Sequence, residues 1–138
     1  MIKDKGTYII ILSLDEEAAI TVGRLGIFSF PPGYYLYVGS ALGGLSARIM
    51  RHVRGANKLH WHIDYLRQEA KVVEVWYLVS GQRLECRWYR AASGMANART
   101  LVAGFGSSGC ACLSHLLYFD SKPSFEEFLQ RLGEQGAH

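Results

Sequence analysis

The stretch from Tyr34 to His52 reads YYLYVGSALGGLSARIMRH and predicts a strand that leads directly into a helix. Its first part is rich in aromatic and β-branched residues, which favour strands. Two glycines then allow a tight turn. After the turn, Leu45, Ile49 and Val53 recur every four residues, which places them on one face of a helix over residues 45–54.

Two polar residues of this helix border the apolar face. Arg48 and His52 are also four residues apart, so we expect both at the edge of the buried surface. One interpretation is that they extend to solvent or bind backbone carbonyl groups. The other is a phosphate site, because an arginine can neutralise charge on a phosphate. The pattern leaves both interpretations open.

A second helix, predicted over QRLECRWYRAA (residues 82–92), carries a carboxylate on its apolar face. Leu84, Trp88 and Ala92 form the apolar stripe, and Glu85 falls inside it. A carboxylate in an apolar setting is costly unless it is paired, protonated or bound to a metal. Arg48 is the candidate ion-pair partner, and a divalent cation or a catalytic role is the alternative.

Two tyrosines each lie beside a glycine in a predicted strand. Tyr8 belongs to GTY (residues 6–8) and Tyr37 to YVG (residues 37–39). Strand tyrosines are commonly core aromatics with a hydroxyl at a polar edge. Together with the arginine, the histidine and the glutamate they also suit phosphate chemistry, in which one carboxylate can hold Mg²⁺ or Mn²⁺.

The ordered set GTY, YVG, Arg48, His52 and Glu85 resembles the GIY-YIG nuclease superfamily. The segments WHIDYL (61–66) and GFGSSGCACLSHLLYF (104–119) resemble an uncharacterised branch of it, which is sometimes fused to a DNA-repair glycosylase of the endonuclease III type.

The chain departs from the family pattern at several positions. Thr7 replaces the usual isoleucine, and the gap between the two motifs is unusually long. Gly109 stands where the branch usually has an aspartate, which puts activity in doubt. Asn97 is the candidate for an asparagine that often follows the glutamate helix.

The resemblance implies an α+β fold with a small central antiparallel sheet flanked by helices. An extra hairpin, built from AITV (19–22) and GIFSF (26–30), lies between the motifs. The resemblance also implies metal-dependent hydrolysis of DNA phosphodiester bonds. In that chemistry Tyr8 helps to deprotonate water, through Tyr37 or His52. Arg48 stabilises charge on the phosphate, and Glu85 holds one Mg²⁺ or Mn²⁺.

Four further residues are candidates for substrate binding. Arg51, Arg54 and Lys58 lie on one connection and could contact a phosphate backbone. The alternative for them is a solvated basic face. His62 is the fourth candidate, and a hydrogen bond to the backbone is its alternative role.

Cys110, Cys112 and His115 could supply three zinc ligands, with Cys86 or His62 as a fourth. The alternative is buried thiols that pack as small hydrophobic groups. The chain has three cysteines, too few for a disulfide framework, which favours reduced thiols.

The composition predicts one domain over residues 1–138, with a core over about 6–119 and a C-terminal helix over about 124–133. Of the 138 residues, 49% are hydrophobic and 20% are charged, so a folded core is expected. We expect Ser124 to cap the last helix, with Glu127 completing a capping box. The absence of an apolar leader or a long apolar run predicts a cytoplasmic protein.

The expected partners are DNA, which the net charge of +3 permits, and a DNA-repair protein. Two other functions stay open. One is a nucleic-acid-binding module without turnover, and the other is a zinc-stabilised interaction domain. The sequence does not fix the oligomeric state.

Overall fold

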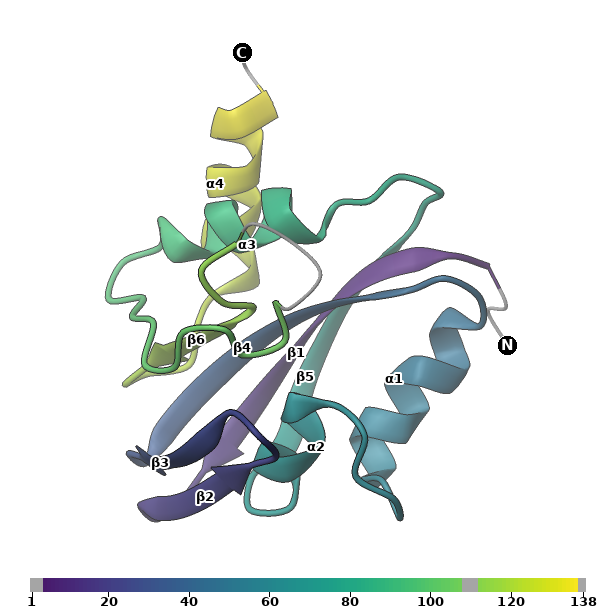
Figure 1. The fold of residues 1–138 in the computed structure, drawn as a ribbon. Helices are drawn as coiled ribbons and strands as arrows, with labels where there is room; N and C mark the ends of the chain where they lie inside the picture. The colour runs from purple at the N-terminus through teal and green to yellow at the C-terminus, as the bar shows by residue number, and fades with distance from the viewer. Residues whose placement is uncertain (1–3, 108–111, 137–138) are drawn as a thin grey trace.

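A four-stranded antiparallel sheet forms the centre of the molecule, and the computed structural model describes residues 4–107 and 112–136. The strand order is β5-β1-β4-β6 (Figure 1). Its members are β1 (Gly6–Leu14), β4 (Gly33–Ala41), β5 (Lys71–Val79) and β6 (Leu116–Phe119). With four helices and a hairpin around this sheet, the predicted α+β class is confirmed.

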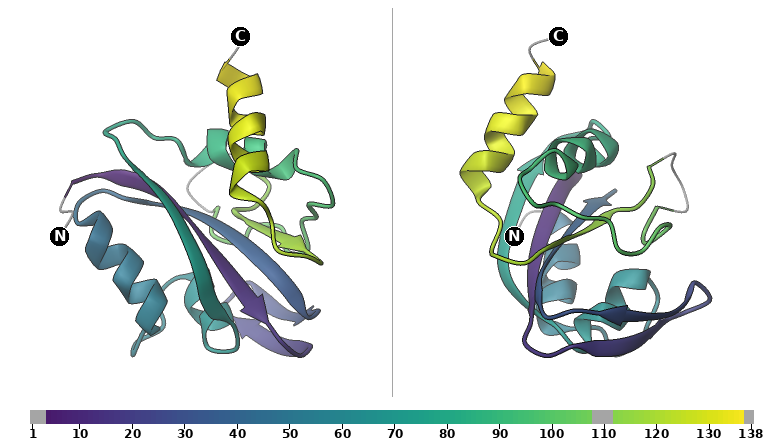
Figure 2. Two further views of the ribbon diagram at one scale, coloured as in Figure 1. Left: turned by 180° about the vertical axis from the view of Figure 1, so that it is seen from behind. Right: turned by 90° about the vertical axis from the view of Figure 1, so that its left-hand side faces the viewer.

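The two faces of the sheet bury two separate cores. Alternating residues of a strand point to opposite faces, so Tyr8 and Ile10 enter one core while Ile9 and Ile11 enter the other. The first core is covered by α1 (Leu45–Arg54), α2 (His62–Arg67) and the hairpin, and the second by α3 (Glu85–Ser93) and α4 (Phe125–Gly136). Figure 2 shows the helices on both sides of the sheet.

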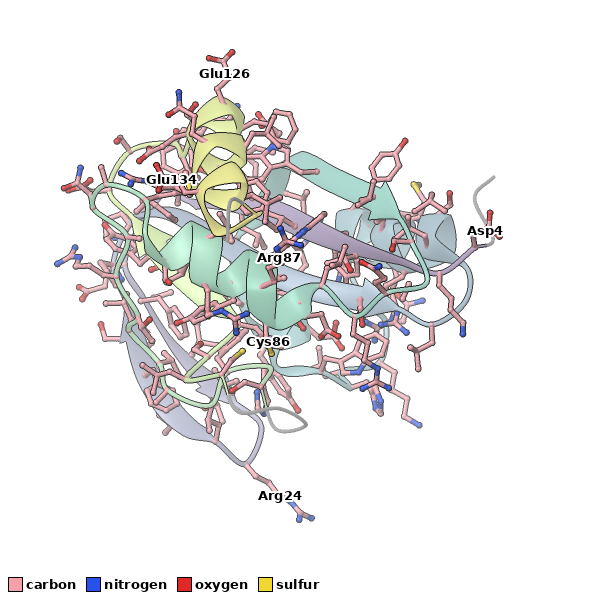
Figure 3. All side chains as sticks on the ribbon, turned by 90° about the horizontal axis from the view of Figure 1, so that it is seen from above. Asp4, Arg24, Cys86, Arg87, Glu126 and Glu134 are labelled. Carbon is pink, nitrogen blue, oxygen red and sulfur yellow. The ribbon has the colours of Figure 1, made fainter. Side chains whose placement is uncertain are left out.

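The predicted hairpin between the two motifs is confirmed as β2 (Ala18–Val22) and β3 (Gly26–Phe30). These strands form a two-stranded sheet of their own. Ile20, Val22 and Phe30 are buried in the first core. The insertion therefore covers the central sheet instead of adding strands to it, and Arg24 marks its tip in Figure 3.

Helix α1 has the predicted bounds, but its buried face differs from the predicted one. Val53 is 38% exposed, whereas His52 is only 2% exposed. With about 3.6 residues per turn, seven residues nearly complete two turns, so His52 stays on the face of Leu45. Val53 turns a further step toward solvent. The prediction that His52 lies at the edge was therefore wrong, and His52 is a core residue.

Both motif glycines leave room for a neighbouring side chain. Tyr8 lies directly opposite Gly39 in the β1–β4 ladder, and a Cβ on Gly39 would be 2.5 Å from the Tyr8 ring and hydroxyl. A Cβ on Gly6 would be 2.7 Å from the Leu45 side chain. The glycine of YVG therefore lets the Tyr8 ring lie across the strand, and the glycine of GTY lets α1 pack closely.

Helix α4 extends to Gly136, beyond the predicted end at about residue 133. Its start agrees in part with the predicted capping box, because Ser124 Oγ accepts a hydrogen bond from the Glu127 backbone N–H at 3.3 Å. The Glu127 carboxylate instead accepts from the backbone of Ala96 at 2.8 Å. This hydrogen bond ties α4 to the turn after α3.

Within residues 4–107 and 112–136, no helix is long and apolar enough to cross a membrane.

Candidate active site

A cavity of about 340 Å³ lies where the end of β4, α1 and the start of α3 come together. Its polar lining includes Ser40, Arg48, Glu85 and His115, and the Trp61 ring forms part of its wall. The sequence separation of these residues is large, so the fold brings them together. The structure thus places the predicted Arg48 and Glu85 on one cavity.

Tyr8 and His52 form a buried pair in the first core. The Tyr8 hydroxyl lies 2.7 Å from His52 Nε2. Burial raises the pKa of Tyr8 to about 12, although the nearby Arg48 guanidinium opposes that rise. Burial also lowers the pKa of His52 to about 4. At neutral pH the pair is therefore a neutral phenol hydrogen-bonded to a neutral imidazole, and Nε2 accepts from Tyr8 in the tautomer that carries its proton on Nδ1.

His52 Nδ1 is buried and has no hydrogen-bond partner among the described residues. Among the described residues, the Tyr8 hydroxyl is thus the one hydrogen-bond partner of the His52 ring. A buried imidazole with a single partner is destabilised when it takes up a proton. The stability of the fold should therefore depend on pH through this residue.

We expect acid to destabilise the protein through His52. The unfolded His52 takes up a proton near pH 6.5, whereas the folded one does so near pH 4, so stability falls as the pH drops through this window. The loss should reach about 2 kcal/mol at pH 5. The free energy of unfolding, measured with urea at pH 7.5 and at pH 5, should fall less between these two pH values for His52→Gln than for the unsubstituted chain. An equal difference in both proteins would contradict this assignment, and His60→Gln, an exposed histidine, is the control.

Tyr37 lies beside this pair on β4. Its ring centroid is 6.1 Å from that of His52 and 6.1 Å from that of Phe105, edge-on in both cases. Burial raises its pKa further than that of Tyr8. Tyr35 shares this face of the sheet and Tyr34 packs on the other, as the period of two in a strand predicts.

Arg48 is held in place by the sheet and by an aromatic ring. Its Nη1 donates to the Ser40 carbonyl oxygen at 3.0 Å, and its guanidinium carbon lies 4.3 Å from the centroid of the Trp61 ring. Arg51 stacks on the same ring at 4.2 Å. Such cation–π contacts stabilise each arginine and limit its motion. Arg48 is therefore presented to the cavity in a fixed position.

Glu85 begins α3 and binds Ser40, not Arg48. Ser40 Oγ donates to Glu85 Oε1 at 2.7 Å, while the other carboxylate oxygen lies 4.0 Å from His115 Nδ1. Arg48 and Glu85 thus share Ser40 as a neighbour, one at its carbonyl and one at its hydroxyl. The Glu85 side chain is 27% exposed, so its carboxylate remains accessible from the cavity.

The predicted substrate-binding residues occupy different environments. Arg51 forms a bidentate ion pair with Asp64, at 2.7 and 2.9 Å. Arg54 and Lys58 are exposed and, with Arg51, line a hollow of about 460 Å³ beyond the end of α1. His62 Nδ1 accepts a hydrogen bond from the Gly106 backbone at 2.8 Å, which is its predicted alternative role.

Two of the predicted zinc ligands come together with Cys86. The candidate ligand atoms of Cys86, Cys112 and His115 all lie within 4.8 Å of one another. Cys110 and Gly109 lie outside the described residues. The other candidate fourth ligand, His62, has its Nδ1 bound to Gly106 instead.

Asn97, the weakest of the site candidates, follows the last turn of α3. It is exposed and has a positive φ of 65°. Glu85 is at the first turn of the same helix, so nine helical residues separate the two ends. Asn97 therefore occupies a turn at the end of α3 remote from Glu85.

The sequence interpretation missed Ser40 and Trp61 as parts of the site. Ser40 directly follows the YVG motif, so its position at the end of the strand was a usable signal. Trp61 belongs to the WHIDYL segment, but nothing in its spacing predicted a stack between two arginines.

Fold and site together define an α+β domain with a polar cavity lined by an arginine and a glutamate, beside a buried tyrosine–histidine pair. The profile of the family described as Domain of unknown function DUF123 matches residues 7–137. The chain therefore belongs to this family, whose function is unknown. No curated protein and no solved structure matches the chain.

Proposed function

We propose that this chain is a divalent-metal-dependent endonuclease that hydrolyses DNA phosphodiester bonds, with a site of the GIY-YIG type. The observation that carries the proposal is the convergence of Arg48 and Glu85 on one cavity beside the Tyr8–His52 pair. Phosphodiester hydrolysis needs a positive charge on the phosphate, a carboxylate for the metal ion and a group that accepts a proton. Arg48, Glu85 and the Tyr8–His52 pair can supply these three functions.

Glu85 fits a divalent cation, because it is an accessible carboxylate beside a hydroxyl and a cavity with room for water and phosphate. When bound, Mg²⁺ or Mn²⁺ supplies Lewis-acid stabilisation of the phosphate charge. Arg48 contributes a fixed positive charge to the same phosphate. Ser40 orients the Glu85 carboxylate through its hydrogen bond.

The Tyr8–His52 pair moves the proton of the attacking water. The Tyr8 oxygen accepts that proton while its own proton passes to His52 Nε2, 2.7 Å away. The water oxygen then forms the new bond to phosphorus while the bond from phosphorus to the leaving sugar oxygen breaks. Solvent water protonates the leaving oxygen, and the proton on His52 returns through Tyr8 to solvent, which restores the pair. Burial lowers the pKa of His52, so the imidazole is neutral and able to accept a proton at neutral pH, and the same burial favours release of that proton after the step.

The exposed basic residues beyond α1 support contact with a nucleic acid. Arg54 and Lys58 flank a hollow of about 460 Å³. Arg48 and Arg51, which both contact the Trp61 ring, lie earlier in the same helix, and Arg51 also lines this hollow. Lysine and arginine contacts to phosphates give affinity without sequence preference.

The test is cleavage of plain, flapped and branched DNA with Mg²⁺ or Mn²⁺. We expect cleavage by the unsubstituted chain and its loss in Glu85→Ala and Arg48→Ala. Glu126→Ala and Arg90→Ala, at exposed positions of α4 and α3, are the matched controls and should cleave normally. Binding of DNA without cleavage of any substrate would refute the endonuclease and favour a binding module. Full cleavage by Glu85→Ala would refute the site.

A further inference from the structure

Two cysteines and a histidine gather next to the cavity from two separate segments. Cys86 lies in the first turn of α3, whereas Cys112 and His115 belong to the segment that leads into β6. Their ligand atoms lie within 4.8 Å of one another. Among residues 4–107 and 112–136, no other group of three histidine, cysteine or acidic side chains is arranged in this way.

The chemistry of these three groups suits zinc. Two thiolates and an imidazole are typical of tetrahedral Zn²⁺ sites, in which the ligand atoms lie roughly 3.5–3.8 Å apart, as follows from bonds of about 2.0–2.3 Å. The three ligand atoms all lie within 4.8 Å of one another, so at most a small inward movement is needed. Hard cations such as Mg²⁺ prefer oxygen ligands and are not expected here.

The segment between α3 and β6 has little regular structure to hold it in place. Its described residues form no helix, and their one strand-like contact is an isolated bridge between Arg99 and Tyr118. Long irregular segments of this kind are uncommon in small domains without another restraint. Yet His115 is only 3% exposed, and its backbone N–H donates to the Phe105 carbonyl oxygen at 2.8 Å. This end of the segment is therefore fixed against the core.

The surroundings of His115 match those of a histidine that binds a metal. Metal-bound histidines commonly use their second ring nitrogen for a carboxylate or a backbone group. The Gly106 backbone hydrogen-bonds this imidazole, and the Glu85 carboxylate lies nearby, 4.0 Å from His115 Nδ1, which is beyond hydrogen-bond distance. In Figure 3, Cys86 lies on the side of α3 that faces the loops near the cavity, away from Arg87.

We propose that Cys86, Cys112 and His115 bind one Zn²⁺, which fixes the segment before β6 to the first turn of α3. With three protein ligands, the fourth tetrahedral position is left to water. Cys86 and His115 line the same cavity as Glu85, but the zinc uses ligands different from the carboxylate proposed to hold the catalytic cation. Because Cys86 follows Glu85 in the chain, the zinc also fixes the position of the Glu85 backbone at the cavity. Removing the zinc should loosen both segments.

The test is direct measurement of zinc on the full chain, without DNA. The protein is purified under reducing conditions, reconstituted with Zn²⁺ and analysed for bound metal. We expect one zinc per chain and a rise in Tm on zinc addition. Cobalt substitution should give a thiolate-to-cobalt charge-transfer band. Cys86→Ser and Cys112→Ser should each lose that band and bind zinc at least about tenfold more weakly.

Leu113→Ala is the matched control, because Leu113 lies between two of the proposed ligands but is 62% exposed. This variant should retain one zinc per chain. Zinc well below one equivalent in the reduced wild-type chain would overturn the proposal. So would equal zinc affinity in the serine variants, or a Cys86–Cys112 disulfide that persists under reduction. These readouts do not depend on DNA cleavage, so a failed nuclease assay leaves them unaffected.

Discussion

Tyr8→Phe should lower the rate of DNA cleavage by about 10²- to 10⁴-fold, which is the usual contribution of a general acid or base. The substitution keeps the ring that packs over Gly39 and removes only the hydroxyl that contacts His52 Nε2. The attacking water then has no group that can take its proton. The measurement is single-turnover cleavage of the best substrate at saturating enzyme.

The matched control for this variant is Tyr35→Phe. Tyr35 is buried in the same core, and its hydroxyl makes one hydrogen bond, to the Pro31 carbonyl oxygen at 2.5 Å. Each substitution removes a buried, hydrogen-bonded hydroxyl, so each should lower the free energy of unfolding by about 1–3 kcal/mol, and Tyr8→Phe also removes the contact of that hydroxyl with Arg48. Only Tyr8→Phe should slow cleavage. Equal slowing in both variants would mean that the effect comes from packing and not from chemistry.

The sequence could predict the elements because each one has a local pattern. The bounds of α1 and the hairpin both followed from spacing and turn residues, and both were confirmed. The orientation of α1 was harder. His52 and Val53 are adjacent in the sequence, and the four-residue spacing predicted that Val53, not His52, lies on the buried face of α1. The tertiary contact between His52 and Tyr8 decides that question, and no local spacing encodes it.

The site could be predicted as a set of residues but not as a geometry. The motif order pointed to Arg48 and Glu85, which the structure places on one cavity. An ion pair between them was one of two alternatives, and the structure instead gives both a contact with Ser40 of β4. A residue that bridges two partners through its backbone and its side chain leaves no pattern in the sequence.

The candidate zinc ligands also show that sequence spacing does not determine which residues come together in the fold. The CxCxxH spacing selected Cys110, Cys112 and His115, while Cys86 was one of two options for a further ligand. Only the packing of α3 against the segment before β6 distinguishes Cys86 from His62. Ligands from distant segments depend on the fold, so spacing can suggest them but cannot choose among them.

Asp64→Ala should lower the free energy of unfolding by about 3–5 kcal/mol, the range for a buried charge pair that loses one partner. Asp64 is 3% exposed and its carboxylate accepts two hydrogen bonds from Arg51. It also accepts from the backbone N–H groups of His60 and Trp61, both at 2.8 Å. Burial alone would raise the pKa of Asp64, but these hydrogen bonds hold it below its ordinary value.

The loss should extend from stability to the site, because Asp64 fixes the backbone of Trp61 and the position of Arg51. Both arginines that stack on the Trp61 ring then lose a rigid partner, and one of them is Arg48. Urea unfolding measures the stability, and Asp120→Ala, an exposed aspartate, is the control. A loss below about 1 kcal/mol, as for a surface ion pair, would contradict the role assigned to Asp64. Arg51→Leu combined with Asp64→Ala should cost less than the sum of the single variants, because each single variant already removes the ion pair between the two side chains.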